Sequence, residues 1–142
     1  MLKKPLHTII VKTAGSKCNL ACTYCFYLNK ELRYEQETVM DLETLKVFIK
    51  QVMEDPNQQT GIVWQGGEPT LAGVGFFEQA ISYMLEYGKN RHKIISNLLQ
   101  TNGFHLSDPL IKLLKNYSFL VGLSLDGPAE IHDYYRKTKT GV

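Results

Sequence analysis

The chain alternates two patterns of hydrophobic and polar positions. Short runs rich in β-branched and aliphatic residues recur along it, and such nearly continuous apolar runs are typical of buried strands in parallel sheets. Between them lie stretches in which apolar residues recur every three or four positions, which predicts helices that bury one face. We expect strands at residues 7–12, 61–64, 94–100 and 119–125. We expect helices at residues 41–54 and 76–87, and a third that opens at residues 107–109.

Each helical stretch carries an apolar face that we expect to be buried. In the first helix the face comprises Leu42, Leu45, Ile49 and Val52. In the second it comprises Phe77, Ala80, Ile81, Met84 and Leu85. In the third it comprises Leu110, Leu113, Leu114 and Tyr117. Ser107 is a suitable N-cap for the third helix, and Pro109 suits its first turn.

The order of these elements predicts the fold class. Strands and helices alternate as β-α-β-α-β-α-β, which is typical of an α/β protein whose parallel strands are joined by right-handed crossovers. We expect the strands in sequential order with the helices on one face, as in a (β/α) barrel cut open. A closed eight-stranded barrel needs about 250 residues, whereas this chain has 142. We therefore expect about half a barrel or a small open sheet, in a chain that is truncated.

Composition excludes several classes of protein. Hydrophobic residues make up 44% of the chain and charged residues 21%, which is enough apolar material for a core and argues against disorder. The formal net charge is only +2, so we expect no nucleic-acid or membrane-surface partner. No apolar run is long enough to span a bilayer or to form a signal-peptide core. We therefore expect a cytoplasmic protein, whose cysteines do not form a disulfide framework.

The strongest chemical signal is a group of three cysteines after the first predicted strand. Cys18, Cys22 and Cys25 are spaced C-x3-C-x2-C, so one short loop can bring three thiolates to a common metal centre. Zinc normally takes four ligands in a structural site, and none of the histidines lies at zinc-finger spacing from these cysteines. An iron–sulfur cubane normally takes four cysteines, so three would leave one iron open to a small molecule. The third alternative is that the cysteines are ordinary buried residues.

Two further motifs follow the second and third predicted strands, at the edge where α/β folds place their sites. After the second strand, Gly66 and Gly67 allow backbone groups to approach a ligand closely. Glu68 offers a carboxylate there, which suits an ammonium group, and a plain turn is the alternative. After the third strand, residues 100–103 read Gln-Thr-Asn-Gly. They either supply polar groups to a site or form a turn.

A last motif follows the fourth predicted strand. Ser124 opens the sequence Ser-Leu-Asp-Gly-Pro, which alone predicts the end of a strand and a turn. Arg136 lies twelve residues further along, and its guanidinium has the chemistry to pair with the carboxylate of a ligand. The alternative is that Arg136 belongs to a solvated basic tail together with Lys137 and Lys139.

Together these motifs resemble a known superfamily. C-x3-C-x2-C with Tyr24 just before the last cysteine resembles the radical S-adenosylmethionine (SAM) superfamily, and Gly-Gly-Glu-Pro at 66–69 resembles its second motif. The wider sequence is similar to anaerobic sulfatase-maturating enzymes over essentially the whole chain. The segments that carry this similarity are residues 18–20, 24–28, 64–71, 100–103 and 124–128.

The resemblance implies a fold, cofactors and site residues. Residues 1–142 would be the N-terminal portion of a radical SAM (β/α) barrel. Cys18, Cys22 and Cys25 would hold a [4Fe-4S] cluster, and the amino and carboxylate groups of SAM would chelate its open iron. The residues expected to contact SAM are Tyr24 near the adenine, Gln65, Gly66, Gly67 and Glu68 at the methionine amino end, and Ser124 and Arg136.

The resemblance also implies an activity and partners. The family oxidises a cysteine or serine of a target sulfatase to formylglycine, by means of a 5′-deoxyadenosyl radical that forms when an electron splits SAM. The implied partners are a sulfatase polypeptide and an electron donor such as a flavodoxin or ferredoxin. Family members are longer and carry further cluster cysteines and a proposed base in their C-terminal part. We therefore expect the catalytic residues to lie beyond residue 142 and this chain alone to be inactive.

Other expectations stay open beside this one. The chain also fits another radical SAM enzyme that modifies peptides or small molecules. A zinc-stabilised binding module is an alternative from a different class. If the barrel is cut after the fourth strand, the exposed edge and apolar surface predict self-association.

Overall fold

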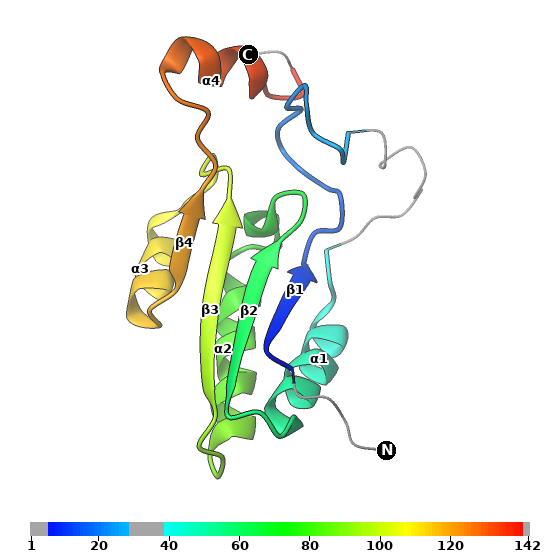
Figure 1. The fold of residues 1–142 in the computed structure, drawn as a ribbon, viewed down its shortest axis with the longest axis vertical. Coiled ribbons are helices and arrows are strands. Elements are labelled where there is room, and N and C mark those ends of the chain that lie inside the picture. Colours follow the sequence, from blue (N-terminus) through cyan, green and yellow to red (C-terminus); the bar gives the residue numbers. More distant parts are fainter. Residues whose placement is uncertain (1–5, 29–38, 141–142) are drawn as a thin grey trace.

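Four parallel strands form one sheet in the computed structural model, which describes residues 6–28 and 39–140 (Figure 1). The strands are β1 (Thr8–Lys12), β2 (Gln59–Gln65), β3 (Ile94–Thr101) and β4 (Leu120–Leu123). They lie in the order β1-β2-β3-β4, and every neighbouring pair is parallel. The predicted strand order and direction are therefore confirmed.

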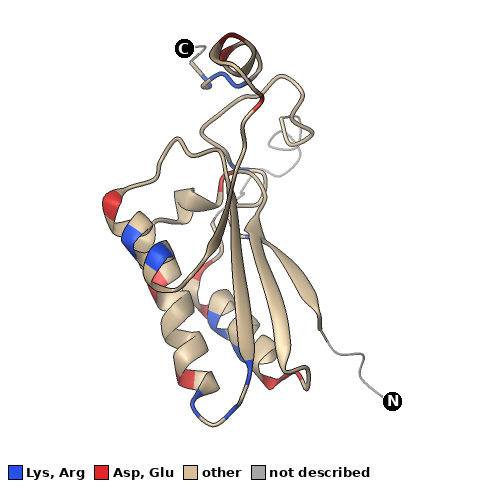
Figure 2. Ribbon diagram, turned by 60° about the vertical axis from the view of Figure 1, so that its left-hand side comes forward, with Lys and Arg blue, Asp and Glu red and all other residues tan. Residues whose placement is uncertain are grey.

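Three helices connect the strands and cover one face of the sheet. They are α1 (Leu42–Glu54), α2 (Val74–Gly88) and α3 (Asp108–Asn116). Figure 2 shows them on one side of the strands, while no helix covers the other side in the described part of the chain. The α/β class and the helix layer on one face are confirmed, and the arrangement is that of part of a (β/α) barrel. No helix among the described residues is long and apolar enough to cross a membrane.

The core lies between the sheet and the helices and is centred on Trp64. Its ring is fully buried and packs edge-to-face against Phe48, Phe76 and Phe77. The indole Nε1 donates a hydrogen bond of 2.9 Å to Asn97 Oδ1 on β3, which satisfies the one polar atom of the ring. Edge-to-face packing of this kind adds to the stabilisation from burying the aromatic area.

Burial alternates along the strands, which corrects the expectation of continuously buried runs. In β2, Thr60, Ile62 and Trp64 are buried, while the residues between them are only partly covered. In β1, Ile10 is 57% exposed although its neighbour Val11 is buried. The reason is that successive side chains of a strand point to opposite faces, and helices cover only one of them. Along β4 no residue is buried.

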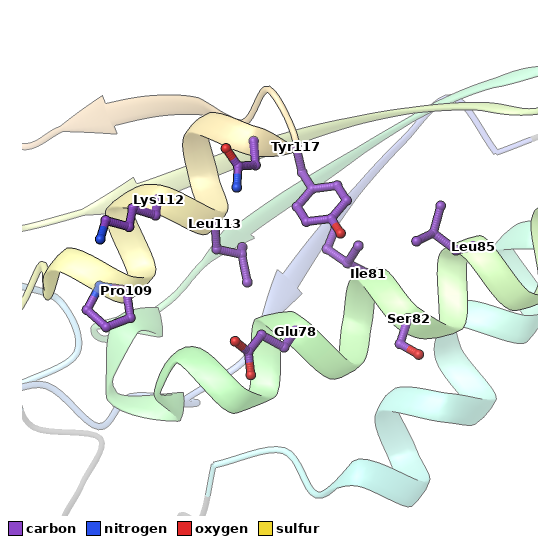
Figure 3. Close-up of a pocket in the computed structure, with 9 residues that line it drawn as sticks. Glu78, Ile81, Ser82, Leu85, Pro109, Lys112, Leu113 and Tyr117 are labelled. Carbon is purple, nitrogen blue, oxygen red and sulfur yellow. The ribbon is translucent and has the colours of Figure 1, made fainter.

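Three of the predicted core residues are exposed: Leu42, Leu85 and Tyr117. Leu42 is the first residue of α1, directly after its N-cap Asp41, whose side chain accepts a hydrogen bond from Thr44 N. Leu85 and Tyr117 line an open groove of about 480 Å³ between α2 and α3, in which the helices do not close over them (Figure 3). The prediction that these three side chains are buried is therefore wrong: Leu42 and Tyr117 lie at helix ends, and α2 and α3 leave Leu85 uncovered.

The sequence patterns did not predict two helical elements. The 3₁₀-helix η1 (Pro69–Ala72) follows β2, and α4 (Ala129–Tyr135) follows β4. Helix α4 has no buried residue: its apolar side chains Ile131, Tyr134 and Tyr135 have helical spacing, but all three are exposed. In Figure 1 it lies beyond the carboxyl ends of the strands, beside the segment that carries the cysteines.

Candidate metal centre

The three cysteines lie on the loop that follows β1, at the carboxyl edge of the sheet. The register pairs Lys12 with Gln65 and Thr101 with Leu123, so the carboxyl ends of the strands lie along one edge. Figure 1 shows the loop rising from β1 beyond that edge. Cys22 is buried, and the other two cysteines are partly exposed.

The three thiols are free and influence one another electrostatically. Burial raises the pKa of Cys18, while hydrogen bonds from Leu20 N and from the Asn102 side chain oppose that rise. Burial also raises the pKa of Cys22, with Arg136 opposing and the charges of Cys18 and Cys25 adding to the rise. Hydrogen bonds and a positive charge that oppose the rise favour the thiolate, which is the form that ligates metal.

The donors on this loop fit an iron–sulfur cluster by their chemistry. Three thiols on one loop make a soft donor set, of the kind that selects iron–sulfur clusters or zinc. Within residues 6–28 and 39–140, no three Cys, His, Asp or Glu side chains are gathered closely enough to hold a metal ion. Convergence of the thiols on one centre therefore stays a prediction, because a bound metal is itself what gathers its ligands.

The Gly66-Gly67-Glu68 segment lies against the start of the cysteine loop. Both glycines have positive φ, at 95° and 50°. A Cβ on Gly67 would lie 2.1 Å from the carbonyl oxygen of Lys17, and Glu68 N donates a hydrogen bond of 2.9 Å to that same oxygen. The close backbone approach that the glycines were expected to permit is therefore made by the residue before Cys18.

The Glu68 carboxylate is buried and joins β2 to β3. Oε1 accepts hydrogen bonds from Thr70 N at 3.0 Å and from the Thr101 hydroxyl at 2.8 Å. Oε2 accepts one from Asn102 N at 2.7 Å. Only 1% of Glu68 is exposed, so these three donors offset part of the cost of burying a carboxylate. Its contact with an ammonium group of SAM stays a prediction.

Asn102 connects Glu68 to the first cysteine, a role that the sequence analysis left open between a polar group and a turn. Its Nδ2 lies 3.7 Å from Cys18 Sγ and 2.9 Å from Asn19 Oδ1. Leu20 N donates to the same sulfur at 3.4 Å. The ends of β2 and β3 are thereby joined to Cys18 by a continuous chain of hydrogen bonds.

On the other side of the loop, Tyr24, Asp126 and Arg136 form a second set of contacts. The Tyr24 hydroxyl donates to Asp126 Oδ2, and Arg136 pairs with Asp126 Oδ1 at 3.0 Å. The Arg136 guanidinium also lies 5.6 Å from the centre of the Tyr24 ring, a cation–π arrangement. Partial desolvation and the bond to Asp126 raise the pKa of Tyr24 to about 12.

Backbone hydrogen bonds reinforce this second set. Ala21 N donates to Lys137 O at 2.7 Å, and Thr23 N donates to Tyr135 O at 3.0 Å. A short antiparallel bridge pairs Leu20 with Thr138. The segment that the sequence analysis offered as a solvated basic tail therefore lies against the cysteine loop, and Arg136 is half-buried within it. The predicted contact of Arg136 with SAM stays a prediction.

Ser124 and Gln65, the remaining predicted site residues, lie at the same edge. Ser124 follows β4, and its hydroxyl accepts a hydrogen bond of 2.9 Å from Gln100 Nε2. Gln65 is the last residue of β2 and is partly buried. The structure thus brings all ten predicted site residues to the carboxyl ends of the strands or the cysteine loop. Their individual roles stay predictions.

Sequence reasoning missed the contributions of Asp126 and Asn102 to this edge. Both lie in motifs that were singled out, but each motif alone reads as a turn. Asp126 pairs with Tyr24, which is 102 residues away in the sequence, and Asn102 contacts a cysteine 84 residues away. Spacing in one sequence carries no signal for contacts of such separation.

Comparison with known proteins agrees with the arrangement of the motifs. The family model of the radical SAM superfamily matches residues 13–141. The chain is 41% identical, over 140 residues, to the cysteine-type anaerobic sulfatase-maturating enzyme of Clostridium perfringens, with 97% of this chain and 38% of the relative covered. It is 39% identical, over 141 residues, to the serine-type enzyme of Bacteroides thetaiotaomicron, with 97% and 33% covered.

Solved structures give the same result for the fold. The structure of native anSMEcpe with bound AdoMet and Cp18Cys peptide superposes with a TM-score of 0.86 at 41% sequence identity, and the match covers 97% of this chain and 36% of that one. A second structure, with AdoMet and Kp18Cys peptide, gives a TM-score of 0.88 at 41% identity, with 97% and 37% covered. This chain spans little more than a third of the length of these relatives. Because the family model matches nearly the whole chain, the protein belongs to the radical SAM superfamily.

Proposed function

We propose that this chain binds a [4Fe-4S] cluster through Cys18, Cys22 and Cys25, and SAM at the iron those cysteines leave open. We propose further that it acts in the oxidation of a cysteine or serine of a sulfatase polypeptide to formylglycine. One observation carries the proposal. Three free thiols lie on the loop after β1 in a chain that is 41% identical to a sulfatase-maturating enzyme over 97% of its length.

The cluster, when bound, supplies the electron that cleaves SAM, and the chain's own residues hold and orient both groups. Ser124 presents a hydroxyl at the end of β4, and Tyr24 presents an aromatic ring that is 55% exposed and open to an adenine. Gln65, Gly66 and Gly67 line the end of β2. Arg136 carries a positive charge for a carboxylate, which it shares with Asp126.

Glu68 is proposed to receive the amino group of SAM, and its hydrogen bonds leave one acceptor position for this role. A carboxylate offers about four acceptor positions. Three are taken by Thr70 N, the Thr101 hydroxyl and Asn102 N, which leaves one on Oε2. The three bonds from the chain would hold that oxygen in a fixed position, so that little reorganisation is needed when a ligand binds.

The substrate and the electron donor belong to the proposal. Cysteine-type and serine-type enzymes match this chain at similar identities, 41% and 39%, so the proposed oxidised residue is either cysteine or serine. The peptides in the neighbouring structures favour a polypeptide substrate. We also propose a flavodoxin or ferredoxin as the donor and a cytoplasmic location, where thiols stay reduced.

The domain assignment is a proposal as well. We propose that residues 1–142 correspond to the N-terminal portion of a radical SAM (β/α) barrel, with the catalytic residues outside this chain. The coverage of 36% of a solved relative supports this. The edge strand β4, with Leu120 66% exposed, supports self-association, which light scattering at tens of micromolar tests. A clean monomer would contradict it.

Anaerobic reconstitution with iron and sulfide tests the cluster. The parent chain is expected to take up roughly four iron atoms and to show the broad visible absorption of a cluster. Cys22→Ala is expected to take up much less, because one ligand is lost. Thr23→Ala, a change in the same loop that removes no sulfur, is the matched control and should behave like the parent. Uptake of about one zinc and no sulfide would favour the zinc-stabilised module instead.

A titration with SAM tests the second half of the proposal. If the open iron dominates binding, the reconstituted chain binds SAM and the metal-free chain does not. Tight binding to the metal-free chain would show that the protein contacts suffice, which contradicts this account of the site.

A further inference from the structure

The side chain of Asn102 points from the end of β3 toward the first cysteine. Its Nδ2 lies 3.7 Å from Cys18 Sγ, within the range of a hydrogen bond to sulfur. Leu20 N reaches the same sulfur at 3.4 Å. Two N–H donors therefore converge on one prospective cluster ligand, one from the loop itself and one from the sheet.

The orientation of the Asn102 amide is determined by its other contacts. Its Oδ1 accepts a hydrogen bond of 2.9 Å from Phe104 N, and its Nδ2 donates one of 2.9 Å to Asn19 Oδ1. Turning the amide over would set a donor against the Phe104 N–H and an oxygen against Asn19 Oδ1. The network therefore requires that the NH₂ group face the sulfur.

The position of Asn102 is determined by the core. Its backbone N–H donates at 2.7 Å to Glu68 Oε2, and that carboxylate is 1% exposed and also bound to Thr101. The donor is thus held by the ends of β2 and β3 rather than by the cysteine loop. A donor held in this way keeps its place when the loop adjusts to a cluster.

Hydrogen bonds to the sulfur ligands of an iron–sulfur cluster adjust its reduction potential. Adding an electron makes the cluster and its thiolates more negative, so an N–H···S bond stabilises the reduced state more than the oxidised one. We propose that Asn102 is a positioning residue that donates a hydrogen bond to the Cys18 sulfur and thereby raises the reduction potential of the cluster. This inference rests on the proposed function, because it requires that a cluster be bound.

Substituting the donor by an apolar side chain of similar size tests the inference. Asn102→Leu in the full, anaerobically reconstituted chain keeps the backbone bond to Glu68 and removes the donor to sulfur. Its potential, from a redox titration followed by electron paramagnetic resonance, is expected to be more negative than the parent's. We expect the oxidised-to-reduced ratio at a fixed potential to rise roughly threefold to tenfold, where tenfold is about 59 mV for a one-electron couple.

Two further variants serve as controls. Asn116→Leu makes the same chemical change at an exposed position at the end of α3, and its potential should equal the parent's. Asn102→Ala removes the donor without inserting bulk, so it should shift the potential in the same direction as the leucine. A shift with leucine alone would indicate a steric effect and would overturn the inference.

A spectroscopic readout is independent of the potential. With asparagine labelled by ¹⁵N, pulsed electron paramagnetic resonance of the reduced cluster should show a nitrogen coupling that Asn102→Leu abolishes. Equal potentials and an unchanged coupling, at equal iron content, would refute the inference but not the proposed function. Loss of the cluster in both Asn102 variants would show that the residue retains the cluster rather than tunes it, which also overturns the inference. Failure of the parent to take up a cluster would defeat the proposed function itself.

Discussion

The cysteine loop is held at its two sides by contacts of very different character. The Cys18 side is tied to strand ends through Glu68 and Asn102, whose bonds belong to a buried network. The Cys25 side is tied through Tyr24 to Asp126 and Arg136, which flank α4, a helix that buries no residue. Buried polar contacts are costly to break, since each orphaned group loses water as well as its partner. The Tyr24–Asp126 bond is exposed and the Arg136–Asp126 pair is only part-buried, so these contacts exchange with water more readily than buried ones do.

This difference indicates that the two sides of the loop differ in rigidity. The buried side provides a fixed frame, in which the backbone of Lys17 packs directly on Gly67. The outer side is held by charge and by short backbone pairing between residues 20–23 and 135–138. We therefore expect the outer side to open first and the buried side to open only when the sheet unfolds.

The largest expected effect comes from Gly67→Ala. The added Cβ would lie 2.1 Å from Lys17 O, in a backbone conformation with φ of 50°. Clash and strain together should lower the free energy of unfolding by about 3 kcal/mol or more, measured by urea denaturation. The matched control is Gly75→Ala in α2, where nothing lies within 4 Å, and it should be neutral or slightly stabilising. Similar losses of unfolding free energy in both variants would contradict the conclusion that the contact between Gly67 and Lys17 holds the buried side of the loop in place.

A smaller loss is expected from Glu68→Gln. The substitution keeps the shape but sets an NH₂ group against one of the three donors that the carboxylate now accepts. Hydrogen bonds to charged groups contribute about 1.5–3 kcal/mol, and we expect a loss in that range by urea denaturation. The exposed Glu78, in α2, provides the control Glu78→Gln, which should change stability little. If Glu68→Gln left the free energy of unfolding unchanged, the buried hydrogen bonds of Glu68 would contribute less to stability than their burial implies.

Asp126→Asn should open the outer side without affecting the core. The substitution removes the charge that pairs with Arg136 and weakens the acceptor of the Tyr24 hydroxyl. We expect amide hydrogen exchange at Ala21 and Thr23 to speed up roughly several-fold, with little change in urea denaturation. Asp133→Asn, an exposed change in the nearby helix α4, is the control. Unchanged protection of both amides would indicate that the backbone bonds alone hold this side.

The smallest effect is the pH dependence of the same contacts. Hydrogen bonds from Arg136 and Tyr24 lower the pKa of Asp126 below its ordinary value of 3.8. A carboxyl with a lowered folded pKa stabilises the folded state fully above 3.8, and that contribution disappears as the pH falls through the lowered value. The difference in exchange between the parent and Asp126→Asn should therefore be constant at neutral pH and vanish in acid. A difference that persists below the lowered pKa would contradict this origin.

Much of the fold followed from local patterns. The three-four spacing of Leu45, Ile49 and Val52 marked α1, and the β-branched run at residues 8–11 marked β1. Alternation of strands with helices then predicted a parallel sheet, since a helical crossover brings the next strand back in the same direction. Helix α4 was not predicted, although Ile131, Tyr134 and Tyr135 have helical spacing, because a helix of seven residues shows little more than one repeat of that spacing.

The sequence by itself determined the strand order, the helix layer and the cysteine spacing, because each depends on neighbours within a few turns of chain or on simple connectivity. Only the tertiary structure decided that Glu68 binds Thr101 and Asn102, that Asn102 reaches Cys18, and that Arg136 lies beside Tyr24. Those contacts join residues from 33 to more than 100 positions apart. They depend on the register of neighbouring strands and on the position of α4, a helix that buries no residue. Neither has a local periodicity that a single sequence can display.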